Sequence, residues 1–153
     1  MSESLAVPRT HIHFTFDTDD CWPPVPGETL WATVLGDNRY LIDNIPFFVE
    51  EIALNDVVEA ETGADGCLHF TRKLASGGHS TIQVGAHEKV EEALIGELKS
   101  LGCGLERDEP GFFSVDVPPE VSLLDALAIC DKWSTNGSDS MVTAKAICLQ
   151  REA

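Results

Sequence analysis

The sequence is short of basic residues. It has ten lysines and arginines against 26 aspartates and glutamates, which gives a formal net charge of −16 at pH 7. The deficit holds in both halves: residues 1–79 carry thirteen acids and four bases, and residues 80–153 carry thirteen acids and six bases. Because an acidic surface repels phosphate backbones, this balance disfavours nucleic-acid binding. It favours encounter with a basic protein, although a high charge also serves simple solubility.

Long apolar runs, a secretory signal and paired cysteines are missing as well. No apolar run approaches the ~20 residues that span a bilayer. The N-terminal stretch "MSESLAVPRT" lacks the basic start and long apolar centre of a secretory signal. The five cysteines are scattered and form no CxxC pair, which argues against a zinc ribbon or a thioredoxin-type motif. We therefore expect a cytoplasmic protein with reduced thiols and no membrane contact.

The common catalytic and cofactor motifs are absent too. Neither GxGxxG nor GxxxxGK[ST] occurs, and there is no Gly-x-Ser-x-Gly elbow. His79 and Ser80 are neighbours on a predicted strand, so they face opposite sides and cannot form a base–nucleophile pair. Cys103 follows the C-terminal end of a predicted helix, whose dipole disfavours a thiolate. The sequence therefore predicts no catalytic residues and no cofactor, which favours a non-catalytic protein.

Short alternating segments dominate residues 1–78. In "THIHFTFDTDD", Ile12, Phe14 and Phe16 alternate with polar residues, which predicts a half-buried strand running into an acidic turn. Further short strands follow, with "GDN" closing one hairpin and "SGGH" joining residues 67–75 to residues 80–86 as another. This pattern is typical of a small barrel or meander.

Residues 79–153 change character. The stretch "HEKVEEALIGELKSLG" places four apolar residues on one stripe, which predicts an amphipathic helix that ends at Gly102. Ser122, with Asp125 three residues on, marks the start of a second helix. With the predicted strands the order is β-α-β-β-α-β, the ferredoxin-like arrangement. We therefore predict an α+β fold, with a β-rich half (1–78) and a ferredoxin-like half (79–153), as two domains or one continuous domain.

Four short stretches together resemble one family of short bacterial proteins that is known only as a domain of unknown function. They are Leu30-Trp31-Ala32, Asn44-Ile45-Pro46-Phe47, Asn55-Asp56-Val57-Val58 and Gly78-His79-Ser80-Thr81. Asn55 stands where the family usually has glycine, and asparagine tolerates left-handed backbone angles. The resemblance covers roughly residues 28–150. It implies a bacterial source and supplies no established activity.

A metal site is one hypothesis for the first strand. His11 and His13 share one face of it, so both imidazoles could reach one ion. A third ligand would come from Asp17, or from His69 or His79 on other strands. The ordinary explanation is that the two histidines are the solvent face of the strand. The metalloenzyme that this site would imply is therefore kept only as an alternative.

Acidic clusters on predicted loops and turns are the candidate binding residues. They are Glu50, Glu51, Glu106, Asp108 and Glu109. Such clusters are usually solvated, but they can also dock lysines and arginines of a basic partner. We predict a non-catalytic acidic binding or inhibitory protein, such as a bacterial immunity protein that neutralises a basic toxin. A small-molecule-binding regulatory module is a further alternative, on fold analogy alone. The oligomeric state is left open.

Overall fold

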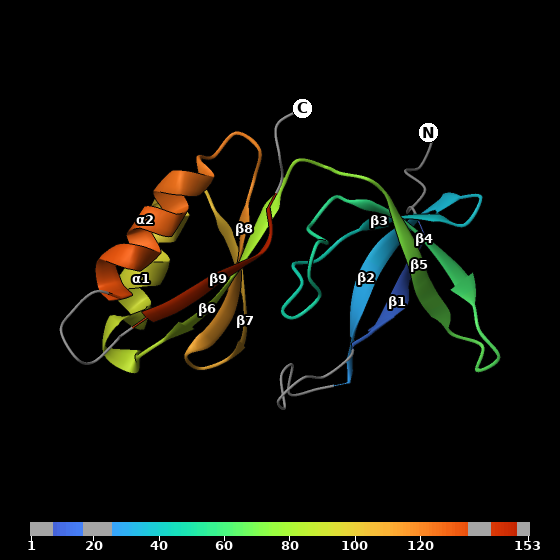
Figure 1. Cartoon of the computed structure of the whole chain (residues 1–153), viewed down its shortest axis with the longest axis horizontal. Coiled ribbons are helices and arrows are strands. Elements are labelled where there is room, and N and C mark those ends of the chain that lie inside the picture. Colours follow the sequence, from blue (N-terminus) through green and yellow to red (C-terminus); the bar gives the residue numbers. More distant parts are fainter. Residues whose placement is uncertain (1–7, 17–25, 135–141, 150–153) are drawn as a thin grey trace, which may run out of the picture.

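The residues that the structure describes form two sheets and two helices, which confirms the α+β prediction (Figure 1). The structure is a computed structural model that describes residues 8–16, 26–134 and 142–149. The elements are β1 (Arg9–Thr15), β2 (Gly27–Gly36), β3 (Arg39–Ile42), β4 (Val57–Thr62), β5 (Leu68–Ala75), β6 (Ser80–Ala86), α1 (Glu88–Leu101), β7 (Gly104–Glu109), β8 (Phe112–Val117), α2 (Leu123–Ser134) and β9 (Val142–Cys148).

Strands β1 to β5 form a closed barrel. Strand β1 pairs with β2 in antiparallel and with β5 in parallel orientation, which closes the sheet. As the alternation predicts, Ile12 and Phe14 are buried inside the barrel. The β2–β3 hairpin turns at Asp37 and Asn38, whose φ angles of 59° and 63° match the left-handed geometry that such turns need. Asn55 also has a positive φ, 71°, as expected for a residue in a glycine position.

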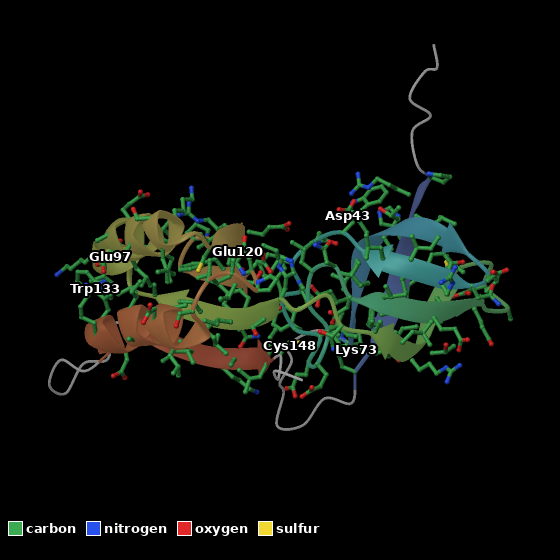
Figure 2. The ribbon with its side chains drawn as sticks, turned by 90° about the horizontal axis from the view of Figure 1, so that it is seen from above. Asp43, Lys73, Glu97, Glu120, Trp133 and Cys148 are labelled. Atoms are coloured by element: carbon green, nitrogen blue, oxygen red, sulfur yellow. The ribbon has the colours of Figure 1, made fainter. Side chains whose placement is uncertain are left out.

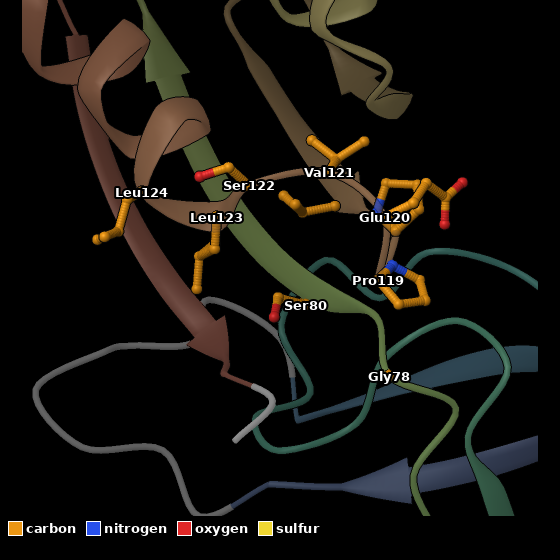
Figure 3. Close-up of a pocket in the computed structure, with 10 residues that line it drawn as sticks. Gly78, Ser80, Pro119, Glu120, Val121, Ser122, Leu123 and Leu124 are labelled. Atoms are coloured by element: carbon orange, nitrogen blue, oxygen red, sulfur yellow. The ribbon is translucent and has the colours of Figure 1, made fainter. Parts of the chain in front are cut away.

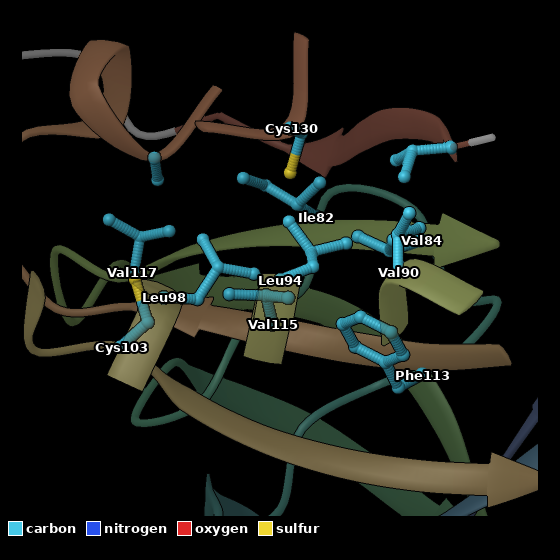
Figure 4. Close-up of a cluster of buried hydrophobic side chains, with 12 residues drawn as sticks. Ile82, Val84, Val90, Leu94, Leu98, Cys103, Phe113, Val115, Val117 and Cys130 are labelled. Atoms are coloured by element: carbon cyan, nitrogen blue, oxygen red, sulfur yellow. The ribbon is translucent and has the colours of Figure 1, made fainter. Parts of the chain in front are cut away.

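The second sheet has the order β7-β8-β6-β9, with both helices on one face (Figure 1). That face carries every second residue of β6 and β8, and its apolar side chains pack between sheet and helices (Figure 4). Gly102 ends α1 with φ 117°, and the Ser122 hydroxyl accepts the Asp125 N–H at 3.2 Å at the start of α2. Glu91 of α1 is buried, and its carboxylate accepts the Gly111 N–H at 2.9 Å.

The segment between β3 and β4 contains no helix or strand and is organised by one carboxylate. Glu28 of β2 accepts the amide hydrogens of three successive residues, Phe47, Phe48 and Val49, at 2.7, 2.9 and 3.0 Å. Buried amides need such partners, since an unpaired one costs about 1–3 kcal/mol. Because Glu28 lies about twenty residues earlier in the chain, the local sequence pattern of the loop does not indicate this contact.

The predicted hairpin between residues 67–75 and 80–86 is wrong. Strand β5 pairs within the barrel and β6 pairs within the second sheet, so the "SGGH" step is the crossing between them (Figure 1). A side chain at Gly77 would collide with the backbone of Asn55, so glycine serves a close passage here rather than a turn. Two consecutive glycines are compatible with a tight turn and with a close passage of the backbone, so the sequence pattern does not distinguish a hairpin from a crossing segment.

The second face of the β6–β9 sheet lies against the barrel and its β3–β4 loop. Gln83 donates its side-chain amide to the Phe47 carbonyl at 2.8 Å, and the Glu51 N–H bonds the Ile147 carbonyl of β9 at 2.7 Å. In Figure 2, Lys73 and Cys148 lie near this contact, while Glu97 and Trp133 lie at the helical end of the molecule. Phe112 of β8 also packs against Phe48 of the loop, with ring centres 5.6 Å apart, so the contact is partly polar and partly aromatic.

Candidate functional site

Most cations of the chain are held by its own acids. Of its ten lysines and arginines, nine lie within the described residues, and six of those nine form ion pairs of 4.0 Å or less with a carboxylate. The pairs are Arg9–Asp43, Arg72–Glu59, Lys73–Asp56, Arg107–Glu91, Lys132–Glu97 and Lys145–Glu50. Little positive charge is therefore left to offset the acidic surface.

The predicted acidic clusters lie at opposite edges of the second sheet. Glu50 and Glu51 are exposed beside β9, where Glu50 pairs with Lys145 at 3.4 Å. Glu106 is half-buried and Glu109 exposed on β7, while the side chain of Asp108 lies outside the described residues. Because three strand spacings separate β7 from β9, the clusters are ~14 Å apart across the sheet. They do not form one tight site, but one protein-sized partner could contact both.

The two histidines of β1 have different neighbours. The His11 ring packs against that of Trp31 at a tilt of 44°, with ring centres 3.8 Å apart. His13 bonds the Thr29 hydroxyl through Nδ1 at 2.7 Å, and its ring centre is 5.6 Å from that of His69. Asp17, the predicted third ligand, lies outside the described residues. The structure thus brings His13 towards His69 rather than pairing His13 with His11.

His69 is in turn held by an aspartate. Its Nε2 lies 3.0 Å from both carboxylate oxygens of Asp65, a contact that lowers the Asp65 pKa together with the stronger effect of the Cys67 amide. His13, His69 and Asp65 border a hollow of about 330 Å³ at this end of the barrel. Within residues 8–16, 26–134 and 142–149, however, no group of three or more His, Cys, Asp or Glu side chains is arranged to hold a metal. The metal hypothesis stays a prediction.

His79 lies at the junction between the sheets. Its Nδ1 donates to Asp116 of β8 at 2.8 Å, and the Asn55 side-chain amide lies 3.2 Å from Nε2. Both contacts are satisfied when the ring carries its proton on Nδ1 and accepts at Nε2. Burial raises the Asp116 pKa, and the bond from His79 offsets only part of this rise. With both ring nitrogens engaged, His79 links two segments rather than acting as a free base.

Asp56 is the second buried group of the junction. Its side chain is fully buried, and it accepts the amide hydrogens of Ala53 at 2.8 Å and Gly77 at 3.0 Å. Lys73 neutralises it from 3.1 Å. Asp56 therefore ties the end of the β3–β4 loop to the crossing segment. The sequence offered only its place in the Asn-Asp-Val-Val motif, and no local signal marked it as buried.

The buried thiols are poor nucleophiles. Burial raises the pKa of Cys103, Cys130 and Cys148 to about 11 in each case, so their thiolates are scarce at neutral pH. Cys103 and Cys130 pack in the core between the sheet and the helices (Figure 4).

Two hollows adjoin the start of α2. One, of about 610 Å³, lies between Gly78, Ser80, Pro119 and the first residues of the helix (Figure 3). The other, of about 590 Å³, runs between α2 and β9. Leu124 borders both, and its side chain is 77% exposed. A single exposed leucine is common on protein surfaces, so Leu124 alone does not define a binding site.

Comparisons with known proteins identify the family of the chain. A family model described as a domain of unknown function (DUF4265) matches residues 28–141. A crystal structure described as a hypothetical protein from Neisseria gonorrhoeae is 21% identical, with a TM-score of 0.80 over 95% of this chain and 98% of that one. At this identity the likeness shows the fold alone. No curated protein matches the chain. None of the described helices is long and apolar enough to cross a membrane.

Proposed function

The chain belongs to the DUF4265 family, and within it we propose that this protein is a non-catalytic acidic module that binds a basic protein. The supporting observation is the charge balance: a net charge of −16 with six of the nine described bases in internal ion pairs. Exposed acids remain on both halves, among them Asp37, Glu61, Glu88, Glu92 and Glu120. Such a surface attracts a basic partner from a distance and repels other acidic proteins.

The proposed partner is a toxin with a basic active-site cleft, which makes the chain a bacterial immunity protein. Its small size and strong negative charge suit that role, because an inhibitor of this kind blocks a positively charged cleft by filling it. We place the protein in the cytoplasm. Four cysteines, Cys67, Cys103, Cys130 and Cys148, are free thiols, as is usual in a reducing compartment.

The acidic clusters at the two edges of the second sheet are the proposed contact points. Glu50 and Glu51 lie beside β9, and Glu106 and Glu109 lie on β7. A typical interface covers about 800 Å² on each partner. That is wide enough to span the ~14 Å between the two edge strands.

Capture from the native host tests the proposal. Tagged protein is incubated with lysate at low salt, and bound proteins are identified before and after a wash at about 1 M salt, where the Debye length falls to about 3 Å. We expect a basic protein that is retained at low salt and released by the wash. Glu50→Gln/Glu51→Gln should weaken its retention more than the matched control Glu61→Gln/Glu92→Gln, which removes two exposed acids outside the clusters.

Recovery of the protein alone at low salt would count against the proposal. Gene neighbourhood is an independent check: a toxin gene directly upstream supports the immunity role, and a metabolic operon contradicts it.

A further inference from the structure

The two edge strands of the second sheet differ in charge. Strand β7, "GLERDE", has four charged residues in six, whereas β9, "VTAKAIC", has one in seven. Exposed sheet edges are usually protected by charged residues, because their unpaired backbone groups otherwise accept another strand. By this measure β7 is protected and β9 is not. The central residues of β9 are exposed: Thr143, Ala144 and Lys145.

The backbone of β9 presents pairing groups to this open edge. On β6 the N–H of Ala86 points towards β8, because it bonds the Gly111 carbonyl. The backbone groups of successive residues in a strand point to alternate sides, so those of Gly85 and Gln83 point towards β9 and bond it. Their partners there are Thr143 and Lys145, and the N–H and C=O of Ala144 therefore point outwards. The far end of the edge is closed, because the Glu51 N–H bonds the Ile147 carbonyl.

An apolar groove runs alongside this edge. It is the hollow of about 590 Å³ between β9 and α2, and its lining includes Leu124, Leu127, Ala128 and Ala144. Two of these four residues are alanines, which leave room for incoming side chains. A strand added at β9 would place every second side chain over this groove, which is how β-strand addition gains specificity.

The charge around the groove selects the occupant. Asp131 lines it and is exposed, while Glu50 and Glu51 stand beside the strand. Lys145, the one charge on β9, is already paired with Glu50. A second copy of a chain with a net charge of −16 is repelled from this surface, whereas a segment that mixes apolar and basic residues is attracted to it.

We propose that the β9 edge and its groove bind an extended, basic and apolar segment of the partner protein as an added strand. The inference rests on the proposed function, since it names the surface and the kind of segment through which a basic partner is held. Apolar side chains of the segment enter the groove, and its backbone pairs with Ala144. Its lysines or arginines point to the other face of the sheet, where Glu50 lies beside Lys145 and Glu51 follows in the chain.

A defined peptide tests this with the full chain. The probe is a fluorescein-labelled peptide of four Val-Lys repeats, and its binding is measured by anisotropy at low salt. Ala144→Pro removes the outward N–H and should leave the fold intact, because proline is tolerated at the solvent side of an edge strand. We expect binding at least about tenfold weaker for Ala144→Pro than for wild type, and near wild-type binding for Ala144→Ser. Peptide binding should also slow hydrogen exchange at the Ala144 amide.

A second variant guards against misfolding of the first. Ala128→Trp fills the groove from α2 without touching the β9 backbone, and it should weaken binding similarly. The inference is overturned if wild type does not bind the peptide, if both variants bind as wild type does, or if a peptide N-methylated at every residue binds equally. A dimer in solution that Ala144→Pro dissociates would also overturn it, since the edge would then hold a second copy. If Ala144→Pro still captures the basic protein from lysate, the inference fails while the proposed function stands.

Discussion

The barrel and the helix-covered sheet bury their residues in different ways. The barrel has one apolar interior, with Ile12, Leu30 and Ile42 fully buried. The sheet has two covered faces: apolar residues meet the helices, and polar residues meet the barrel and its loop. The buried polar residues on that second face are Thr81, Gln83, Ser114 and Asp116. The contact between the two regions combines hydrogen bonds, such as that from Gln83 to the Phe47 carbonyl, with the packing of Phe112 of β8 against Phe47 and Phe48. Each region has an apolar core of its own.

The largest expected effects on stability come from truncating a side chain in either of the two cores. Phe113→Ala in the sheet should lower the free energy of unfolding by about 3–5 kcal/mol, and Leu30→Ala in the barrel by about 2–5 kcal/mol. Because the cores are separate, we expect each variant to speed amide hydrogen exchange mainly in its own sheet. Denaturant unfolding gives the energies, and exchange followed by mass spectrometry locates the loss. Equal loss of protection in both sheets for either variant would show a single cooperative unit.

Removing the Asp56 carboxylate should destabilise the junction, and it should lower the free energy of unfolding by less than a core truncation does. Asp56→Ala leaves the buried amide of Ala53 without its acceptor, at a cost of about 1–3 kcal/mol, and it also removes the acceptor of the Gly77 N–H. Asp56→Asn keeps one side-chain oxygen and should lose less. Thermal unfolding of the two variants measures the difference. If alanine and asparagine destabilise equally, the hydrogen bonds are not what Asp56 contributes.

The smallest expected effect is a pH dependence at Asp116. Burial raises its pKa in the folded chain above the ordinary value of 3.8. Its contribution to stability is then complete below pH 3.8 and is lost as the pH rises through the raised value. Asp116→Asn cannot ionise, so the variant should gain stability relative to wild type between acid and neutral pH. Urea unfolding across that range tests this, and a constant difference at every pH would contradict it.

Local patterns predicted the elements and their ends well. Ile12 and Phe14 in β1, the stripe of Val90, Leu94 and Leu98 in α1, and Gly102 at its end all follow from spacing alone. Such features depend on neighbours a few residues away, and those neighbours are visible in the sequence.

The contact between the sheets could not be predicted in the same way. Alternation shows that Ser114 and Asp116 share a face, but their burial depends on parts of the chain far away in the sequence, such as His79, whose Nδ1 lies 2.8 Å from Asp116. The pairing of Glu28 with three later amides is equally non-local. The sequence identified the residues of the acidic clusters, but their separation across the sheet follows only from the order of the strands.

The Glu28 contact has a consequence for the loop that it organises. Three successive amides that converge on one carboxylate form a small anion receptor, and the chain supplies the ligand itself from β2. A tethered ligand acts at a high effective concentration, so free anions in the cell compete poorly for this receptor. The β3–β4 loop, which carries Glu50 and Glu51, is thereby pre-organised before any partner arrives.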